Sequence, residues 1–337
     1  MHITTTNEYS AILFECREKI VGKRLDKFRK VRENIYRIKI GDTEYIIEPG
    51  IRFHPTKFIE KTEDKDNLCE KISKELINSR ITTITQINND RLIQIETENG
   101  SIILEMFGKG NIIIIKDSKI IAALRNEKWA DREIRPGIAY IPPKGSSGEI
   151  KFDDKYVIVS ILKAPIGKEY AKQILKEIQI DEKTPGNSLL EEQKQEIREK
   201  IEFIINPKNT SPVAYINKDG QVQEIAAVKF LVKEDVQIKE FKTFSEAADE
   251  YYFNYKKINP EIEKLENRLE KQILRKKELE DEEIKFKQMG DLIYLHQEKI
   301  EKLLEKVKTQ KGIEDLENKG IKINKKDKKI EIELEEN

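Results

Sequence analysis

One segment of the chain alternates arginines with acidic residues, at Arg125, Glu127, Asp131, Arg132, Glu133 and Arg135. Guanidinium groups bind phosphate or carboxylate oxygens in a planar, paired geometry, and neighbouring carboxylates can orient them. Pro136-Gly137 favours a tight turn after the last arginine, and Pro142-Pro143 keeps the exit extended. The segment is therefore expected to be a stiff connector that either binds phosphates or forms a salt-bridge cluster between two domains.

A second candidate is the run Asn88-Asn89-Asp90-Arg91, which interrupts a β-like alternation of apolar residues. Asn and Asp favour turns, so Asp90 and Arg91 are expected at the edge of a sheet, with the arginine at the start of a strand. From the residue types alone, this pair fits a capping Asp followed by a solvated Arg.

A third candidate is a tight turn between two helical patterns, which contains Pro165 and Gly167. The lysines that surround this turn are Lys163, Lys168 and Lys172. Backbone N–H groups at the start of the second helix, assisted by these lysines, could hold a phosphate. An ordinary helical hairpin gives the same pattern.

Composition limits the classes of protein to consider. The chain has 337 residues, enough for more than one domain, and its 63 basic and 63 acidic residues cancel, so any nucleic-acid site must be a local patch. Cys16 and Cys69 have no metal-ligand spacing and form no disulfide framework, so we expect no metal, no cofactor and a reducing cytoplasmic compartment. No apolar run approaches about 18 residues, so neither a membrane span nor a secretory leader is expected.

The elements that must position these residues indicate an α+β fold with three regions. Residues 1–150 are expected to form a β-rich sandwich with flanking helices at about 8–21 and 67–78, and Asn99-Gly100 is its strongest hairpin signal. The strands are expected at about 24–31, 34–40, 43–49, 81–87, 91–97, 101–107, 111–116 and 119–124. Residues 151–257 are expected to form a domain that is helical over 154–205 and closed by a hairpin at 212–227.

Residues 258–337 are expected to form a charged helical arm that starts at Pro260, is interrupted at Gly290 and resumes over 292–308, with a strand at 329–334. Apolar residues with a three-four spacing line one side of this arm, at Ile262, Leu265, Leu269 and Ile273. Such a stripe needs a partner helix to bury it. If no partner is present, we expect two copies to associate through the stripe.

The connector, together with Asn89-Asp90-Arg91 and the run from Phe107 to Ile113, resembles the NFACT family. These are ribosome-associated quality-control factors, called NEMF in animals and RqcH in bacteria, and also known as fibronectin-binding protein A. The resemblance implies an N-terminal domain similar to that of formamidopyrimidine-DNA glycosylases, then a helix-hairpin-helix domain and a coiled-coil arm. Glycosylase chemistry is not expected, because those enzymes use an N-terminal proline amine and a cysteine zinc finger, whereas this sequence opens with Met1-His2 and has two cysteines.

The resemblance also implies a function and a set of site residues. The family binds the large ribosomal subunit that still carries peptidyl-tRNA, recruits alanyl-tRNA, and promotes untemplated alanine addition, while the ribosome makes the bond, so no enzyme is expected. Asp90 and Arg91 match the Asp-Arg pair needed for tailing, and Glu8 occupies the place of an acid, usually Asp, near the start of the first helix. We assign tRNA binding also to the connector residues Arg125, Asp131, Arg132 and Arg135. We assign possible phosphate binding to Lys163, Gly167, Lys168 and Lys172.

Part of the family pattern is not found in this sequence. The returning half of the arm and the C-terminal NFACT-R domain do not occur, so the chain resembles an archaeal-like form that is either a fragment or naturally short. Two other functions stay open. One is a generic nucleic-acid-binding module with no role in tailing, and the other is a surface adhesin, which would require export.

Overall fold

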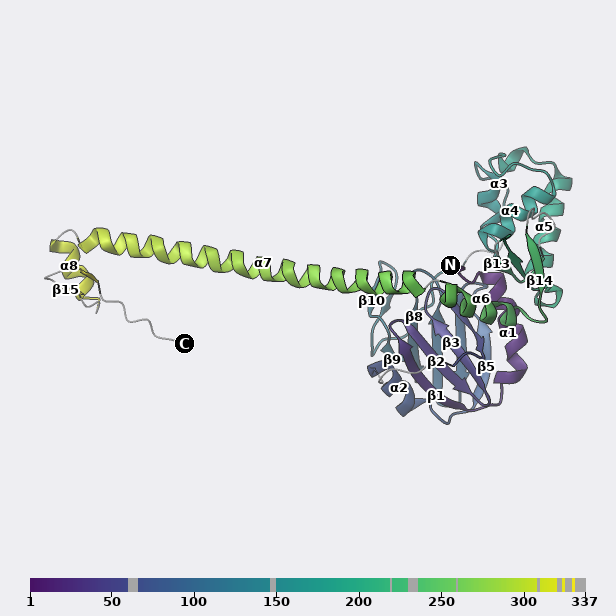
Figure 1. Cartoon of the computed structure of the whole chain (residues 1–337), viewed down its shortest axis with the longest axis horizontal. Helices are drawn as coiled ribbons and strands as arrows, with labels where there is room; N and C mark the ends of the chain where they lie inside the picture. Colours follow the sequence, from purple (N-terminus) through teal and green to yellow (C-terminus); the bar gives the residue numbers. More distant parts are fainter. Residues whose placement is uncertain are drawn as a thin grey trace. The chain divides into compact units, whose positions relative to one another are not determined.

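The computed structural model describes residues 1–59, 66–145, 150–218, 220–229, 236–258, 260–307, 310–319, 323–324 and 329–330. The fold is α+β with several antiparallel sheets, as predicted (Figure 1). The chain divides into two compact units, residues 1–258 and 259–337.

Two antiparallel sheets and two helices form the first part of unit 1. The first sheet contains β1 (Leu25–Arg32), β2 (Ile35–Ile40), β3 (Thr43–Glu48) and β4 (Arg52–Thr56), paired in that order. The second sheet contains β5 (Ile81–Gln86), β6 (Leu92–Thr97), β7 (Gly100–Glu105), β8 (Asn111–Lys116) and β9 (Lys119–Ala123). The helices are α1 (Thr6–Ile20) and α2 (Asn67–Glu75). Side chains from both sheets and both helices share one core, to which Ile12, Phe53 and Ile93 belong.

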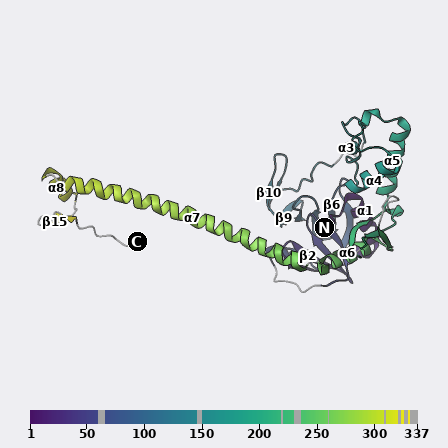
Figure 2. The same ribbon diagram turned by 45° about the horizontal axis from the view of Figure 1, so that its top comes forward.

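The second sheet is apolar on both faces, because alternate side chains point to opposite sides of a strand. On β7, Ile102 and Leu104 belong to the main core, whereas Ile103 belongs to a separate cluster. Ile134 of the connector is buried in that separate cluster. The connector therefore covers the outer face of the sheet, and it forms a small hairpin there, β10 (Glu127–Lys128) with β11 (Glu133–Ile134), near β9 (Figure 2).

Strand β4 was not predicted from the sequence. It contains Pro55, which pairs with Tyr45 of β3. Proline lacks an N–H donor and is tolerated on strands at the edge of a sheet. Because β4 is the last strand of its sheet, the proline removes no hydrogen bond that a further strand would need.

A helical unit follows the connector and has its own core. It contains α3 (Val157–Ile161), α4 (Lys168–Glu177), η1 (Gly186–Ser188), α5 (Glu191–Ile205) and η2 (Pro207–Asn209). A three-stranded sheet closes it, with β12 (Val213–Ile216) between β13 (Val222–Ala226) and β14 (Gln237–Glu240). Tyr215 of β12 lies in the helical core, whereas Ala214 lies in the core of the first two sheets. This small sheet therefore joins the two cores. Asp219, predicted in its hairpin turn, lies outside the described residues.

Helix α6 (Phe244–Ile258) returns the chain to the first core. Glu15 of α1 accepts hydrogen bonds from Phe244 N (2.7 Å) and Ser245 N (3.0 Å), so a carboxylate satisfies the first N–H groups of α6. Tyr251 and Tyr252 of this helix are buried in that core.

Unit 2 contains one long helix, α7 (Pro260–Val307), followed by α8 (Gln310–Glu317) and the short pair β15 (Ile323–Asn324) and β16 (Lys329–Ile330). The predicted interruption at Gly290 is wrong, because α7 is a continuous helix of 48 residues through this position. A single glycine costs a helix about 1 kcal/mol relative to alanine, and the many favourable neighbours offset this. The predicted strand at 329–334 extends beyond β16 into residues that are outside the described part. No helix in the described residues has the length and apolar character needed to cross a bilayer.

Candidate nucleic-acid interface

The Asn88–Arg91 turn connects β5 to β6. Asn88 and Asn89 have positive φ angles of 56° and 47°, a conformation that asparagine tolerates better than most residues. Hydrogen bonds close the turn, from Ile87 N to Leu92 O (2.8 Å) and from Asp90 N to Ile87 O (3.1 Å). The predicted turn is therefore present, and Arg91 immediately precedes β6.

The charged groups of this turn, Asp90 and Arg91, make few contacts within the protein. The Asp90 carboxylate accepts a hydrogen bond from Arg91 N at 2.7 Å, and both side chains are half-buried. Within the described ranges, no carboxylate forms an ion pair with the Arg91 guanidinium. Burial raises the pKa of Tyr9 on α1, and the positive charge of Arg91 acts against that rise. The guanidinium thus lies close enough to the start of α1 to influence it.

Gln86 fixes the turn to α1. Its side-chain Nε2 donates to Thr6 O and to Asp90 O, both at 2.9 Å. Asn88 Nδ2 donates to Pro143 O at the end of the connector (3.2 Å). The turn is therefore held between the first helix and the connector, which limits the positions that Asp90 and Arg91 can take.

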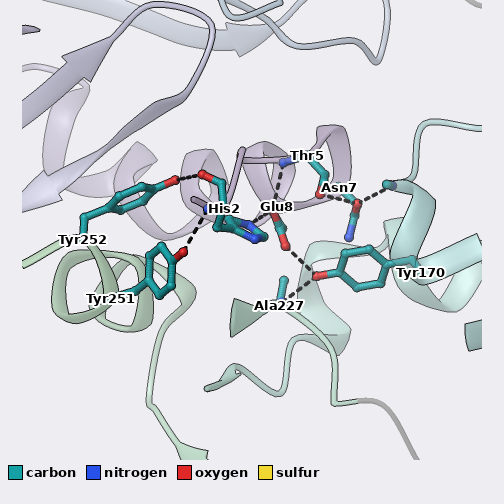
Figure 3. A network of polar contacts seen from close by, with 9 residues as sticks. His2, Thr5, Asn7, Glu8, Tyr170, Ala227, Tyr251 and Tyr252 are labelled. Atoms are coloured by element: carbon teal, nitrogen blue, oxygen red, sulfur yellow. Dashed lines mark hydrogen bonds and ion pairs between the residues drawn. The ribbon is translucent and has the colours of Figure 1, made fainter. Parts of the chain in front are cut away.

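Glu8 of α1 is fully buried, with 0% of its surface exposed. Its Oε2 accepts hydrogen bonds from Thr5 N (2.8 Å) and from the ring of His2 (2.9 Å), and its Oε1 accepts one from Tyr170 OH of α4 (2.9 Å) (Figure 3). Burial disfavours the charged form of His2, but the charge and hydrogen bond of Glu8 outweigh it and raise the pKa of His2. Glu8 therefore lies at the junction of three chain segments, where water does not reach it.

The turn before α4 packs directly on the start of α1. Gly167 is buried, and its N–H donates to Asn7 Oδ1 at 3.3 Å. A Cβ at position 167 would lie only 2.4 Å from Thr5 Cγ2, so glycine is the residue that fits this close approach. One N–H of the predicted phosphate site is thus already occupied by a side chain.

The three lysines near this turn differ in their surroundings. Lys163 pairs with Asp154 at 2.7 Å, and Lys172 pairs with Glu169 one helical turn away at 3.2 Å. Lys168 is exposed and has no ion pair with any residue that the structure describes. It is therefore the lysine of this set best suited to bind an incoming anion.

Arg132 of the connector is engaged inside the protein. Its side chain is 7% exposed and donates through Nη1 (2.6 Å) and Nη2 (3.3 Å) to the carboxylate of Glu105 on β7, which is 2% exposed. Tyr140 OH donates to the same carboxylate at 2.9 Å. The guanidinium also lies 4.2 Å from the centre of the Trp129 ring, close enough for a cation–π contact. Arg132 thus fastens the connector to the second sheet.

Arg125 is likewise used within the protein. Its Nη1 donates to Gly110 O (2.7 Å), and its Nη2 donates to the side chain of Asn34. The amide of Asn111 binds the backbone of Arg125 on both sides, as donor to its O (2.8 Å) and as acceptor from its N (3.1 Å). These contacts join the end of β9 to the turns at both sheets.

Arg135 and Asp131 are the exposed members of the connector set. Arg135 pairs with Glu133 at 2.8 Å, but its side chain is 56% exposed, so this ion pair is weak and can exchange for another partner. Asp131 has no ion pair among the described residues. Leu92 pairs with Glu105 across β6 and β7, so the Arg132–Glu105 pair lies one residue along the strand from Arg91.

The candidate residues thus form two neighbouring groups. Asp90, Arg91, Glu8, Gly167 and Lys168 gather around the start of α1, and the connector residues lie on the outer face of the second sheet. No group of His, Cys, Asp or Glu in the described part has the arrangement of a metal site.

Sequence reasoning missed several residues that hold the first group together. Thr5-Thr6-Asn7-Glu8 has the pattern of a capping box, in which the fourth residue binds back to the N–H of the first, and this signal could have located both the start of α1 and the bond from Thr5 to Glu8. Tyr170 gave no local signal because its partner Glu8 is 162 positions away, and His2 gave none because it lies in the irregular segment before α1.

The chain is similar to known proteins over most of its length. Residues 9–335 match the family model described as NFACT N-terminal and middle domains. The "Archaeal Rqc2 homolog aRqcH" of Methanocaldococcus jannaschii is 27% identical over 341 residues, covering 86% of this chain and 50% of the relative. "Ribosome quality control complex subunit NEMF" of Homo sapiens is 21% identical over 338 residues, covering 89% of this chain and 31% of the relative. The chain therefore spans half or less of the length of these relatives.

Solved structures share the fold. The fibrinogen binding protein from Staphylococcus aureus has a TM-score of 0.58 at 16% identity, covering 74% of this chain and 98% of that one. The N-terminal part of the fibronectin/fibrinogen-binding protein from Streptococcus suis has a TM-score of 0.58 at 19% identity, covering 74% and 99%. At such identities the likeness concerns the fold alone. The match over nearly the whole sequence, together with the ordered motifs, shows that this chain belongs to the NFACT family.

Proposed function

We propose that this chain acts in ribosome-associated quality control, where it binds tRNA on an obstructed large ribosomal subunit and promotes template-independent addition of C-terminal alanine to the stalled chain. The observation that carries the proposal is the Asp90–Arg91 turn, whose guanidinium is without an ion pair among the described residues and whose backbone is fixed to α1. The relatives named as an archaeal Rqc2 homolog and as a ribosome quality control complex subunit support it. The ribosome would form the bond, so the protein is a cytoplasmic recruiting factor and not an enzyme.

The residues divide by role in this proposal. Arg91 and Lys168 contact tRNA phosphates, and Asp90 accepts a hydrogen bond from a sugar or base. The α3–turn–α4 segment acts as the helix-hairpin-helix, with the remaining N–H groups at the start of α4 aimed at the backbone of the tRNA. Arg135 and Asp131 extend this surface. Arg125 and Arg132 support it from inside by holding the connector in place.

We expect the chain to bind alanyl-tRNA with an affinity that falls steeply as salt rises, because bound phosphates release counterions. Replacing Arg91 with alanine should weaken binding and reduce the slope of log affinity against log salt by about one unit, the share of one phosphate contact. Fluorescence anisotropy of labelled tRNA at several salt concentrations measures both quantities.

Arg17→Ala is the matched control. Arg17 is an exposed arginine near the opposite end of α1, and its replacement by alanine removes the same charge. Equal losses for Arg17→Ala and Arg91→Ala would indicate a generic nucleic-acid module that senses only total charge. Thermal unfolding should be nearly unchanged in both variants. A large drop in melting temperature for Arg91→Ala would mean that this side chain has a structural role.

We propose that the long helix α7 is one of the helices of a coiled-coil arm. Large apolar side chains on it are exposed over about half of their surface, with exposures of 49–62%, at Ile273, Leu274, Leu279, Ile284 and Met289. We expect the isolated chain to self-associate with increasing concentration, as two copies cover these side chains. Ile273 and Ile284 lie eleven positions apart, about three helical turns, and therefore share one face.

Sedimentation equilibrium of the chain and of Ile273→Glu with Ile284→Glu tests this expectation. The double variant should remain monomeric at concentrations where the unmodified chain associates, because like charges would face each other across the pair. Replacing two exposed lysines of the same helix, as in Lys276→Gln with Lys287→Gln, changes the net charge by the same two units and is the control for that change. If the unmodified chain stays strictly monomeric at high concentration, a second copy of the chain is not the partner of α7.

A further inference from the structure

Glu8 is a buried carboxylate whose hydrogen bonds come from separate parts of unit 1. Both of its oxygens are occupied, and none of its surface is exposed. A buried charge is costly unless partners satisfy it, so these partners are held in place as firmly as the carboxylate itself. A ligand could reach Glu8 only if the helical unit, or the N-terminal segment that carries His2, moved away from α1.

Tyr170 links Glu8 to the helical unit. Its hydroxyl donates to Glu8 Oε1 and accepts a hydrogen bond from Ala227 N at 2.7 Å, just after β13 (Figure 3). Its ring lies in the helical core. Removal of this one oxygen would therefore leave two buried groups without partners, one on each side of the junction.

The contacts of two residues, Gly167 and His2, reinforce the same junction. Gly167 is in contact with Thr5 and donates its N–H to Asn7, as described above. His2, the other partner of Glu8, is fixed through its backbone, because His2 N donates to Tyr251 OH (2.9 Å) and Tyr252 OH donates to His2 O (2.7 Å). The N-terminal segment, α1 and α4 thus meet at one carboxylate, and α6 holds the N-terminal segment in place.

We propose that Glu8 is a positioning residue, whose buried carboxylate locks the helical unit against the start of α1 and so fixes the separation between Arg91 and Lys168. The effect on tRNA binding rests on the proposed function. The fixed contact between the helical unit and α1, called the lock below, does not rest on it. Arg91 is tied to α1 through Gln86 and the turn, and Lys168 follows Gly167 directly, so both cations take their positions from the same few residues. Two cations at a fixed spacing bind two phosphates of one backbone more tightly than two that move independently.

The lock can be tested without tRNA, by measuring distances between nitroxide labels. The labels are attached to cysteines that replace two exposed residues, Asp42 in the turn between β2 and β3 and Glu196 on α5. The native Cys16 and Cys69 are buried. The labelled chain should give one narrow distance distribution. Tyr170→Phe should broaden or shift it. Tyr156→Phe, in the same helical unit but outside the junction, should leave it unchanged.

Gly167→Ala provides an independent test. The backbone at Gly167 has φ −75° and ψ 157°, which alanine adopts without strain, so the added methyl group acts only through its contact with Thr5. This variant should shift the same distance distribution while the helical content stays constant. Thr5→Ser removes the methyl group that is struck and keeps the hydroxyl, so the double variant should recover much of the original distribution.

Binding of tRNA then separates positioning from direct contact. Tyr170→Phe and Gly167→Ala should each weaken tRNA binding roughly tenfold, and Thr5→Ser should restore the affinity of Gly167→Ala together with its distance distribution. If Glu8→Gln weakens binding while its distance distribution matches the unmodified chain, Glu8 contacts the ligand and the proposal is wrong. Unchanged distances in Tyr170→Phe and Gly167→Ala would also overturn it. If the unmodified chain binds no tRNA, the proposed function fails and the distance measurements alone decide whether the lock exists.

Discussion

Glu105→Leu is expected to lower the free energy of unfolding by about 3–5 kcal/mol, because it leaves the Arg132 guanidinium buried without its counter-charge. Both side chains are nearly inaccessible, at 7% and 2% exposure, so water cannot replace the lost carboxylate. Tyr140 OH loses its acceptor at the same time. Burial, and then the negative charge of Glu105, raise the pKa of Tyr140, which places this hydroxyl in the same closed environment.

Trp129 allows this prediction to be followed locally, since it is the only tryptophan of the chain and lies under the Arg132 guanidinium. Urea unfolding is monitored by circular dichroism for the whole chain and by tryptophan fluorescence for the connector. In Glu105→Leu the fluorescence change should occur at lower urea than the loss of secondary structure.

The double variant Glu105→Leu with Arg132→Met removes both charges of the ion pair. It is the control for the unpaired Arg132 charge that Glu105→Leu leaves buried. It should recover most of the lost stability, because an apolar pair of similar size needs no compensating charge. A double variant as unstable as Glu105→Leu alone would show that packing around β7, and not the ion pair, accounts for the loss.

The β-rich part of the fold could be predicted because its signals are local. The strand at 111–116 was predicted with the bounds that β8 has, and Asn99-Gly100 marks the turn between β6 and β7. The elements that were missed depend on distant partners. Pro55 argues against a strand unless the strand is known to be at an edge, and β14 is exposed along its whole length, so no apolar alternation indicates it. The predicted helix ended at Gly290 because glycine is unfavourable in a helix interior. In the 48-residue helix α7, the favourable residues around Gly290 offset this cost.

In the candidate site, too, local features could be predicted and contacts between distant residues could not. The Asp90–Arg91 turn follows from residue types that favour turns, and its place before β6 could be predicted. The burial of Glu8 could not, because Tyr170 is 162 positions away and nothing near either residue indicates the contact. For the connector, the sequence left phosphate binding and ion pairing open. The partner of Arg132, Glu105, lies 27 positions earlier on a strand whose outward face could not be known to be covered.

Gly110→Ala is expected to destabilise the protein by about 2–4 kcal/mol, through a clash between the turns of the two sheets added to backbone strain. Gly110 has a φ of +67°, and a Cβ there would lie 2.2 Å from Gly50 N and 2.5 Å from Pro49 Cβ. Gly50 is equally constrained, since its own Cβ would lie 2.5 Å from Gly108 O. The turn after β3 and the turn after β7 therefore approach each other backbone to backbone, which explains why glycines are needed at this place.

Gly108→Ala separates strain from clash. Gly108 belongs to the same turn and has a similar φ of +58°, but a Cβ there meets nothing within 4 Å. It should cost only about 1 kcal/mol, the strain of a left-handed conformation for a residue with a Cβ. Urea denaturation of both variants gives the difference between them, which is the contribution of the contact between the two turns. Because Arg125 donates to Gly110 O, Gly110→Ala should also shift the Trp129 fluorescence, whereas Gly108→Ala should not. Equal losses of stability in the two variants would show that the turns can separate freely, and that left-handed strain alone accounts for both glycines.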